Sequence, residues 1–175
     1  MTTYGLTAHD RMLLFVTGVR VDPLDLRPED IDIRDIAHAL SRQCRYNGHV
    51  YGFLSVARHS IWVAELLLDA TGDARLALEG LHHDDSETYL GDMVRPLKHR
   101  PEMYEYIEAE NRAQRIIAKT LGLPYPASLA VKIADTLACH LEILFHCQTY
   151  EGSPQADAED WLTAHHAFTD LLDSE

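Results

Sequence analysis

Four side chains of the kinds that bind metal ions occur at separate points of the chain. They are His59, the adjacent pair His83 and Asp84, and Asp135, and each lies in a stretch with helical spacing of apolar residues. An imidazole or carboxylate that faces a protein core is costly unless it is paired or binds a cation. Two nitrogen and two oxygen ligands suit a divalent transition ion better than Mg²⁺, which prefers oxygen ligands. The sequence therefore predicts one divalent metal ion, Mn, Co or Zn, held by these four residues.

A metal site of this kind has a definite chemistry. Four protein ligands leave open positions on an ion that accepts five or six, and water and a phosphate oxygen can fill them. A water molecule on such an ion is acidified towards neutral pH and becomes a nucleophile. The chemistry predicted from these residues is hydrolysis of a phosphoester.

Each residue also has a purely structural explanation. His59 can be a core histidine bonded to a backbone carbonyl. The polar run at 82–85 can be a helix end in solvent, and we expect His82 to be solvated. Asp135 can lie on the outer face of its helix. The metal hypothesis is favoured because an apolar helical stripe turns into His, Asp and Glu within one turn.

Phosphate requires positive charge, which this acidic chain must concentrate locally. Its 15 Lys and Arg against 28 Asp and Glu leave a formal net charge of −13 at pH 7. We expect phosphate to be held by cations near the metal motifs, namely Arg45, Arg58, Arg95 and Lys98. Arg suits this role because its planar fork donates two parallel hydrogen bonds. Arg45 has an alternative explanation as a surface cation at a helix end.

The same composition argues against several classes of partner. A strongly acidic chain is not expected to bind a nucleic acid polymer or an anionic membrane face. No apolar run is long enough for a transmembrane helix, and the N-terminus does not resemble a secretory signal. The three cysteines, Cys44, Cys139 and Cys147, have no Cys-x-x-Cys spacing. We therefore expect free thiols in a cytoplasmic protein and no thiolate zinc site.

Helices must position the four ligands. Asp32 and Asp73 stand where they can cap the first turn of a helix, and a further helix is expected to begin near Ser55. Asn47-Gly48, Thr71-Gly72 and Gly122 stand where helices can end. Helices are expected at about 32–47, 55–71, 73–89, 101–121, 128–149 and 157–172. Residues 12–21 can form strand or helix, and 23–30 a loop bounded by proline. The predicted fold is all-α, a single compact domain over 1–175 with about six helices.

The ordered series His59, His83-Asp84 and Asp135 resembles the signature of the HD superfamily of metal-dependent phosphohydrolases. The residues that flank these positions also resemble the family's sequences. The similar segments are Ser55-Val56-Ala57-Arg58-His59-Ser60, the stretch from His83 to Leu90-Gly91-Asp92, and Arg95-Pro96-Leu97-Lys98. The chain looks like the compact branch that contains bacterial 5′-deoxynucleotidases and phage dATP triphosphohydrolases. The resemblance covers roughly residues 30–145. It implies an HD-type helical domain with the metal at these four residues.

The resemblance also implies roles for residues around the metal. Glu87 would orient the attacking water or shuttle its proton, and Asp92 would approach the sugar hydroxyl. Arg45 would hold phosphate while Tyr46, where tryptophan is familiar in the family, would pack on the deoxyribose. Gly48 falls where a bulky side chain could screen the base edge, so a permissive base pocket is expected. A homo-oligomer is implied too.

The expected function is hydrolysis of a (deoxy)nucleotide by a metal-activated water. A monophosphate would yield nucleoside and phosphate, and a triphosphate would yield nucleoside and triphosphate; the sequence does not separate a 5′-deoxynucleotidase from a dNTP triphosphohydrolase. Two alternatives stay open. One is hydrolysis of another phosphoester, such as a cyclic nucleotide or an alarmone, because the signature is shared across the superfamily. The other is a nucleotide-binding module without turnover.

Overall fold

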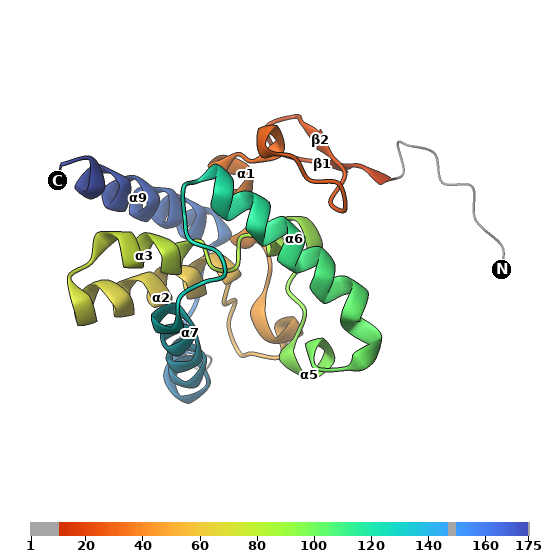
Figure 1. The fold of residues 1–175 in the computed structure, drawn as a ribbon. Helices are drawn as coiled ribbons and strands as arrows, with labels where there is room; N and C mark the ends of the chain where they lie inside the picture. Colours follow the sequence, from red (N-terminus) through yellow and green to blue (C-terminus); the bar gives the residue numbers. More distant parts are fainter. Residues whose placement is uncertain (1–10, 147–149, 175) are drawn as a thin grey trace.

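The computed structural model describes residues 11–146 and 150–174. Among these residues the fold consists of eight α-helices and one small hairpin, so the predicted all-α class is confirmed (Figure 1). The helices are α1 (Ile33–Leu40), α2 (Val56–Thr71), α3 (Ala74–Leu81), α4 (Glu87–Leu90), α5 (Arg95–Lys98), α6 (Tyr104–Thr120), α7 (Leu129–Leu141) and α9 (Pro154–Asp173). Single turns of 3₁₀ helix lie at Pro28–Asp30, Arg45–Gly48 and Pro101–Met103, and a π-helical turn, Glu142–His146, follows α7.

The stretch at 12–21, which the sequence left open between strand and helix, is a hairpin. Strand β1 (Leu13–Leu14) pairs antiparallel with β2 (Arg20–Val21), with Leu13 opposite Val21. Thr17 lies in the turn of this hairpin. Its backbone N–H and its hydroxyl both donate to the buried carboxylate of Asp35. The hairpin is thereby attached to the first turn of α1.

The main core lies between α1, α2, α3 and α9, and α7 packs on the other side of α2 (Figure 1). The largest fully buried side chains of the main core include Trp161, Ile36, Leu40 and Leu81. Gly80 allows α3 to approach α2 closely, because a Cβ atom there would lie 2.5 Å from Leu67 Cδ1. Since α2 contacts both cores, its residues occupy the centre of the molecule.

Three predicted helix starts are confirmed by their caps. The side chain of Asp32 accepts from the Arg34 N–H, that of Ser55 from the Arg58 N–H, and that of Asp73 from the N–H groups at 75 and 76. Each cap satisfies backbone donors that have no partner inside the helix. The start of α2 matters most for function, because it determines the direction of the His59 side chain one turn later.

Several predicted helix ends were wrong. The first helix ends at Leu40 rather than at residue 47, because the chain beyond it pairs with the segment before α2 through a bridge between Cys44 and Ser55 and a hydrogen bond from Arg45 N to Leu54 O. The predicted helix at 73–89 is two helices, α3 and α4, separated by turns at 82–86. The predicted helix at 128–149 is regular only to Leu141, and 149 lies outside the described residues.

The count of about six helices was therefore too low, because one predicted helix is split and the short α5 was not anticipated. No helix in the described residues is long and apolar enough to cross a membrane.

Candidate metal centre

The four predicted ligands come together from three places in the fold. His59 lies on α2, His83 and Asp84 lie in the turns between α3 and α4, and Asp135 lies on α7. The Nε2 atom of His59 is 3.2 Å from Asp135 Oδ1 and 3.8 Å from Asp84 Oδ2. The Nε2 atom of His83 is 3.1 Å from Asp84 Oδ2 and 3.9 Å from Asp135 Oδ1. Two nitrogens and two oxygens thus surround one small space.

Both ring nitrogens that face this space are buried and have no hydrogen-bond partner. The other nitrogen of each ring is engaged, since His83 Nδ1 donates to the Gly80 carbonyl at 2.7 Å and His59 Nδ1 lies 2.6 Å from Glu142 Oε1. A donating Nδ1–H leaves the lone pair on Nε2, which is the form that binds metals. Two ligands at metal–nitrogen bond lengths and a tetrahedral angle would be about 3.4 Å apart. The residues present therefore fit a divalent ion.

The pKa values of three of these groups show how strongly the site attracts positive charge, and a bound metal ion would take the place of the proton that His83 holds in its absence. Burial opposes protonation of His83, but Asp84 and Asp135 outweigh it and raise the pKa of His83 to about 9. Burial likewise acts against the charged form of Asp84, yet the neighbouring imidazoles hold its pKa well below the usual range. The pKa of Asp135 is also lowered, against its burial, by the nearby imidazoles of His59 and His83. Both carboxylates are thus anionic at neutral pH, as metal ligands must be.

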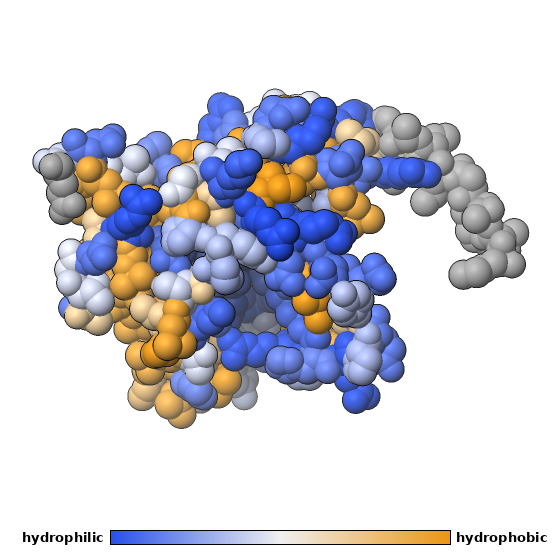
Figure 2. All heavy atoms as spheres, in the orientation of Figure 1, coloured by the Kyte–Doolittle hydropathy of each residue, from blue (hydrophilic) through white to orange (hydrophobic). Residues whose placement is uncertain are grey.

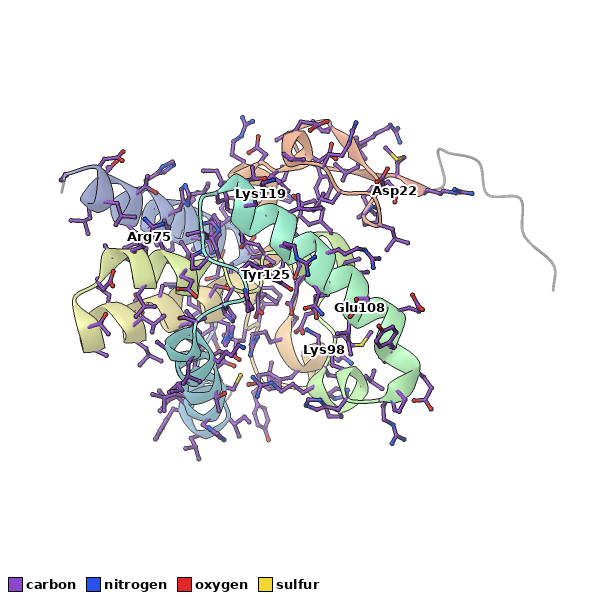
Figure 3. The ribbon with its side chains drawn as sticks, in the orientation of Figure 1. Asp22, Arg75, Lys98, Glu108, Lys119 and Tyr125 are labelled. Atoms are coloured by element: carbon purple, nitrogen blue, oxygen red, sulfur yellow. The ribbon has the colours of Figure 1, made fainter. Side chains whose placement is uncertain are left out.

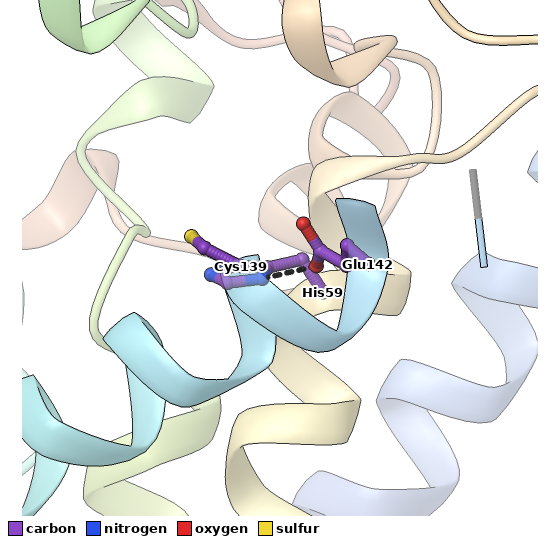
Figure 4. A group of neighbouring side chains, drawn as sticks. All are labelled: His59, Cys139 and Glu142. Atoms are coloured by element: carbon purple, nitrogen blue, oxygen red, sulfur yellow. Dashed lines mark hydrogen bonds and ion pairs between the residues drawn. The ribbon is translucent and has the colours of Figure 1, made fainter. Parts of the chain in front are cut away.

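A second group of metal-binding residue types, His59, Cys139 and Glu142, shares His59 with the first, and Glu142 lies at the Nδ1 side of its ring (Figure 4). Arg45 already fills this space, because its guanidinium donates to Glu142 Oε2 and lies 3.3 Å from Cys139 Sγ. Burial raises the pKa of the Cys139 thiol to about 12, so thiolate is not available at neutral pH. The described contacts of this group are therefore those of Glu142 with His59 and Arg45.

A pocket of 340 Å³ opens beside the metal ligands. It is lined by Asp84 and Asp135, and six further predicted site residues line it as well: Arg45, Tyr46, Glu87, Asp92, Arg95 and Lys98. The remaining lining is mostly apolar and comes from Met93, Val94, Pro96 and Ile143, with Thr136, Cys139 and His140. Ligand sites are commonly apolar cavities with a few converging polar groups.

His59 and His83 lie behind the pocket wall, and two predicted substrate-binding residues are not brought to the pocket. Arg58 points to the opposite side of α2, where its guanidinium donates to Asp157 at 3.0 Å and to Asp160 on α9. These two carboxylates explain Arg58 as a structural cation rather than a phosphate ligand. Gly48 is not among the pocket residues, and its φ of +76° shows that it serves the tight turn at Arg45–Gly48.

Glu87 is buried at the pocket wall, with 3% of its surface exposed. Its Oε2 atom has no hydrogen-bond partner, and Lys98 Nζ is 3.4 Å from its Oε1. Burial, together with the charges of Asp84 and Asp92, raises the pKa of Glu87 well above its ordinary value. An environment of this kind disfavours the charged carboxylate relative to the protonated acid.

The side chain of Gln43 connects the backbones of the two predicted catalytic residues. Its amide nitrogen donates to the Glu87 carbonyl at 2.9 Å, and its amide oxygen accepts from the Asp92 N–H at 2.8 Å. These bonds join the start of α4 to the residue just beyond its end. Sequence reasoning missed Gln43, because no pattern in the chain indicates which distant backbone groups its amide reaches.

Each pocket cation is held by a carboxylate. Arg95 donates to Asp135 Oδ2 at 2.7 Å, and Lys98, labelled in Figure 3, donates to Glu110 on α6 at 2.7 Å. Glu87 and Glu110 outweigh burial and raise the pKa of Lys98 above its usual range. The side chain of Arg95 is 55% exposed, which makes it the most accessible of the pocket cations.

Comparison with known proteins gives two relatives without an assigned activity. An uncharacterized protein of Rhodobacter capsulatus is 38% identical over 160 residues, which cover 87% of this chain and 78% of the relative. The chain belongs to the family of this protein. The uncharacterized protein YfdR of Escherichia coli is 36% identical over 112 residues, covering 64% of this chain and 59% of that protein. No protein-family model matches the chain.

The expectation that His82 is solvated was wrong. Only 1% of its surface is exposed, its Nδ1 is 2.5 Å from Asp85 Oδ2, and its Nε2 is 2.9 Å from His165 Nδ1. Its ring also packs edge-on against Trp161 of α9. The polar run at 82–85 therefore divides between two sides of the chain, with His83 and Asp84 directed at the space beside Asp135 and their neighbours bonded within the core.

Glu142 is the other residue that sequence reasoning left without a role. Glu142 follows Asp135 by seven residues, a spacing that places both on one face of a helix. In the structure it is fully buried and contacts a predicted metal ligand. The shared face was the available signal, since two turns of helix place both carboxylates on the side of α7 that meets α2.

Proposed function

We propose that this chain is a metal-dependent phosphohydrolase of the HD type that acts on nucleotide 5′-phosphoesters. The observation that supports it most is the pair of buried, unpartnered Nε2 atoms of His59 and His83, directed at Asp84 and Asp135. When bound there, a divalent ion supplies Lewis acidity, which lowers the pKa of water and polarises a phosphoryl oxygen. The activity itself, and membership of the HD superfamily, are part of the proposal.

In the proposed reaction, Glu87 manages a proton. Burial and the nearby charges of Asp84 and Asp92 raise its pKa, which favours the protonated acid, and its Oε2 has no protein partner to compete for a proton. It can therefore donate that proton to the oxygen that leaves phosphorus. The Gln43 amide keeps the backbone of Glu87 at a fixed distance from Asp92, which lines the same pocket.

The cations of the pocket hold the phosphate. Arg95 is the best placed, because an incoming phosphate can replace Asp135 as its partner near the surface. Lys98 contributes a second positive charge at the Glu87 side. A deoxynucleotide is the proposed substrate because of the family resemblance, with Tyr46 on the pocket wall as the sugar contact. The proposal includes both monophosphates and triphosphates.

A substrate panel tests this function. The full-length protein is incubated with Mn²⁺, Co²⁺ or Zn²⁺ and with deoxynucleoside and ribonucleoside mono- and triphosphates, a cyclic nucleotide and an alarmone. Products are scored separately for phosphate and triphosphate. Hydrolysis of deoxynucleotides that is lost on chelation is the expected result. Turnover of the cyclic nucleotide or alarmone alone would replace the substrate class, and no turnover with any metal would favour a binding module.

We also propose that the chain self-associates through the outer face of α7. Figure 2 shows hydrophobic side chains gathered at the lower left of the molecule, where Figure 1 places α7. The exposed apolar residues of this segment are Leu129, Ile133, Leu137, Ile143 and Leu144. A shallow groove of 470 Å³ on this face contains Lys132 and His140 but no carboxylate among its described lining. Two copies of a chain with a net charge of −13 meet with least repulsion at such a face.

Light scattering after size exclusion tests self-association. The wild-type protein should elute as a dimer or larger assembly, and Ile133→Asp should give a monomer with an unchanged circular dichroism spectrum. Leu24→Asp is the matched control, because Leu24 is 66% exposed and lies outside α7. A monomeric wild type, or an assembly that survives Ile133→Asp, would overturn the proposal.

A further inference from the structure

The Glu142 carboxylate is fully buried beside the pocket. It lies in the π-helical turn after α7 with none of its side chain exposed. Charges and hydrogen bonds from His59, Arg45 and Tyr46 outweigh burial and lower its pKa, so it is anionic. A buried anion is stable only where donors satisfy its lone pairs, and here three donors do so.

The two oxygens of Glu142 serve different partners. Oε1 accepts from His59 Nδ1 at 2.6 Å (Figure 4). Oε2 accepts from Arg45 Nε at 3.1 Å and from the Tyr46 hydroxyl at 2.7 Å. One oxygen therefore faces a metal ligand, and the other faces two residues of the pocket wall.

We infer that Glu142 is a positioning residue that fixes His59 in the tautomer with its lone pair on Nε2 and at the same time fixes Arg45 and Tyr46 at the pocket. The inference rests on the proposed metal site. A carboxylate that accepts from the remote ring nitrogen of a ligand histidine sets its tautomer and orientation, and its loss typically weakens metal binding 10- to 100-fold. The role of Arg45 changes accordingly, because its Nε and Nη2 atoms donate to Glu142 and Cys139.

Glu142→Gln tests this arrangement because an amide has only one acceptor oxygen. If that oxygen faces His59, the amide NH₂ faces Arg45 and Tyr46, and donor meets donor. If the oxygen faces Arg45, the NH₂ faces His59 and requires a lone pair on Nδ1, which places the proton on Nε2. Either orientation breaks one side of the arrangement, whereas Glu142→Asp retains two acceptors.

Two measurements on the full-length protein follow. The ¹⁵N chemical shifts of the His59 ring in metal-free protein report the tautomer without requiring any metal. Competition with a chelator for Co²⁺ gives the metal affinity. In Glu142→Gln we expect a shift of the His59 tautomer population and Co²⁺ binding 10- to 100-fold weaker. In Glu142→Asp we expect a partial recovery of both.

Asp157→Asn is the matched control for destabilisation. Asp157 is also a fully buried carboxylate, and it accepts from Arg58, from the Ser55 hydroxyl and from the Tyr150 hydroxyl. This variant should lose stability but keep Co²⁺ affinity. The inference is overturned if Glu142→Gln leaves both readouts at wild-type values, or if Asp157→Asn weakens Co²⁺ binding equally. If wild-type protein binds no Co²⁺, the proposed function fails, and the tautomer measurement still decides the role of Glu142. Should Glu142→Gln not fold, Glu142→Asp carries both measurements.

Discussion

Metal binding should stabilise this protein measurably, and His83→Ala should remove that stabilisation. In the metal-free fold the Nε2 atoms of His59 and His83 are buried without a partner. A buried polar group without a hydrogen bond costs about 1–3 kcal/mol, so coordination of both atoms can recover roughly 2–6 kcal/mol. Metal at 100 times its Kd stabilises the folded state by about 2.7 kcal/mol, which lies within this range.

The expected size of the thermal shift follows from the length of the chain. For a domain of this size, 1 kcal/mol corresponds to roughly 2–4 °C in Tm, so saturating metal should raise Tm by about 5–11 °C. His83→Ala removes one of the two nitrogen ligands, and we expect its shift to fall below about 2 °C. Differential scanning fluorimetry with and without chelator measures the shift, and elemental analysis of the dialysed protein measures the bound metal.

His140→Ala is the control for this prediction. His140 is exposed and lines the pocket, but it is not among the residues around the metal space. Its variant should keep both the shift and the metal. A full shift in His83→Ala, or the absence of any shift in the wild type with Mn²⁺, Co²⁺ and Zn²⁺, would refute the metal centre described above.

Three further changes test other parts of the structure. Glu87→Gln should keep stoichiometric metal and lose turnover by ~10²–10⁴-fold in a steady-state assay, and near-normal rates would remove Glu87 from the mechanism. Arg58→Ala should leave KM unchanged but lower the free energy of unfolding in urea by about 3 kcal/mol, because the buried Asp157 then has no cationic partner. A raised KM with unchanged stability would instead assign Arg58 to the substrate site. Burial, with neighbouring His82 and His166, lowers the pKa of His165 from 6.5 to about 4, so the unfolded chain takes up its proton first as pH falls. The stability that neutral His165 contributes is thus present above pH 6.5 and lost towards pH 4, and the fall in Tm over this interval should be shallower in His165→Asn; equal slopes would exclude the assignment.

The comparison of α3 with its prediction shows how far periodicity can be followed. The apolar pattern from Leu76 to Leu81 predicted a helix, and Asp73 indicated where it begins. The same pattern was extended through His83 to residue 89, but the helix ends at Leu81 because the groups beyond it make other bonds. His83 bonds to the Gly80 carbonyl, and His82 bonds to His165 on α9. Only the packed fold supplies the second of these partners.

The phosphate-binding cations show a different limit. Net charge and proximity to the motifs selected four residues, and the structure places three of them at the pocket. Arg58 was assigned with the others because it adjoins His59 in the chain. The side chains of consecutive helical residues point about 100° apart. Arg58 therefore faces α9, whereas His59 faces Asp135 and Asp84.

The chain itself determined the helical class, the capped starts of α1, α2 and α3, and the identity of four candidate ligands, because caps and apolar periods act between residues a few positions apart. Tertiary structure alone decided that Glu142 supports His59, that Arg45 bonds to Glu142, and that His82 is buried. The partners in these contacts are 83 to 97 residues apart in the chain. A side chain that can donate or accept has many eligible partners in a sequence of this length, and only the packing of α2 against α7 and of α3 against α9 selects among them.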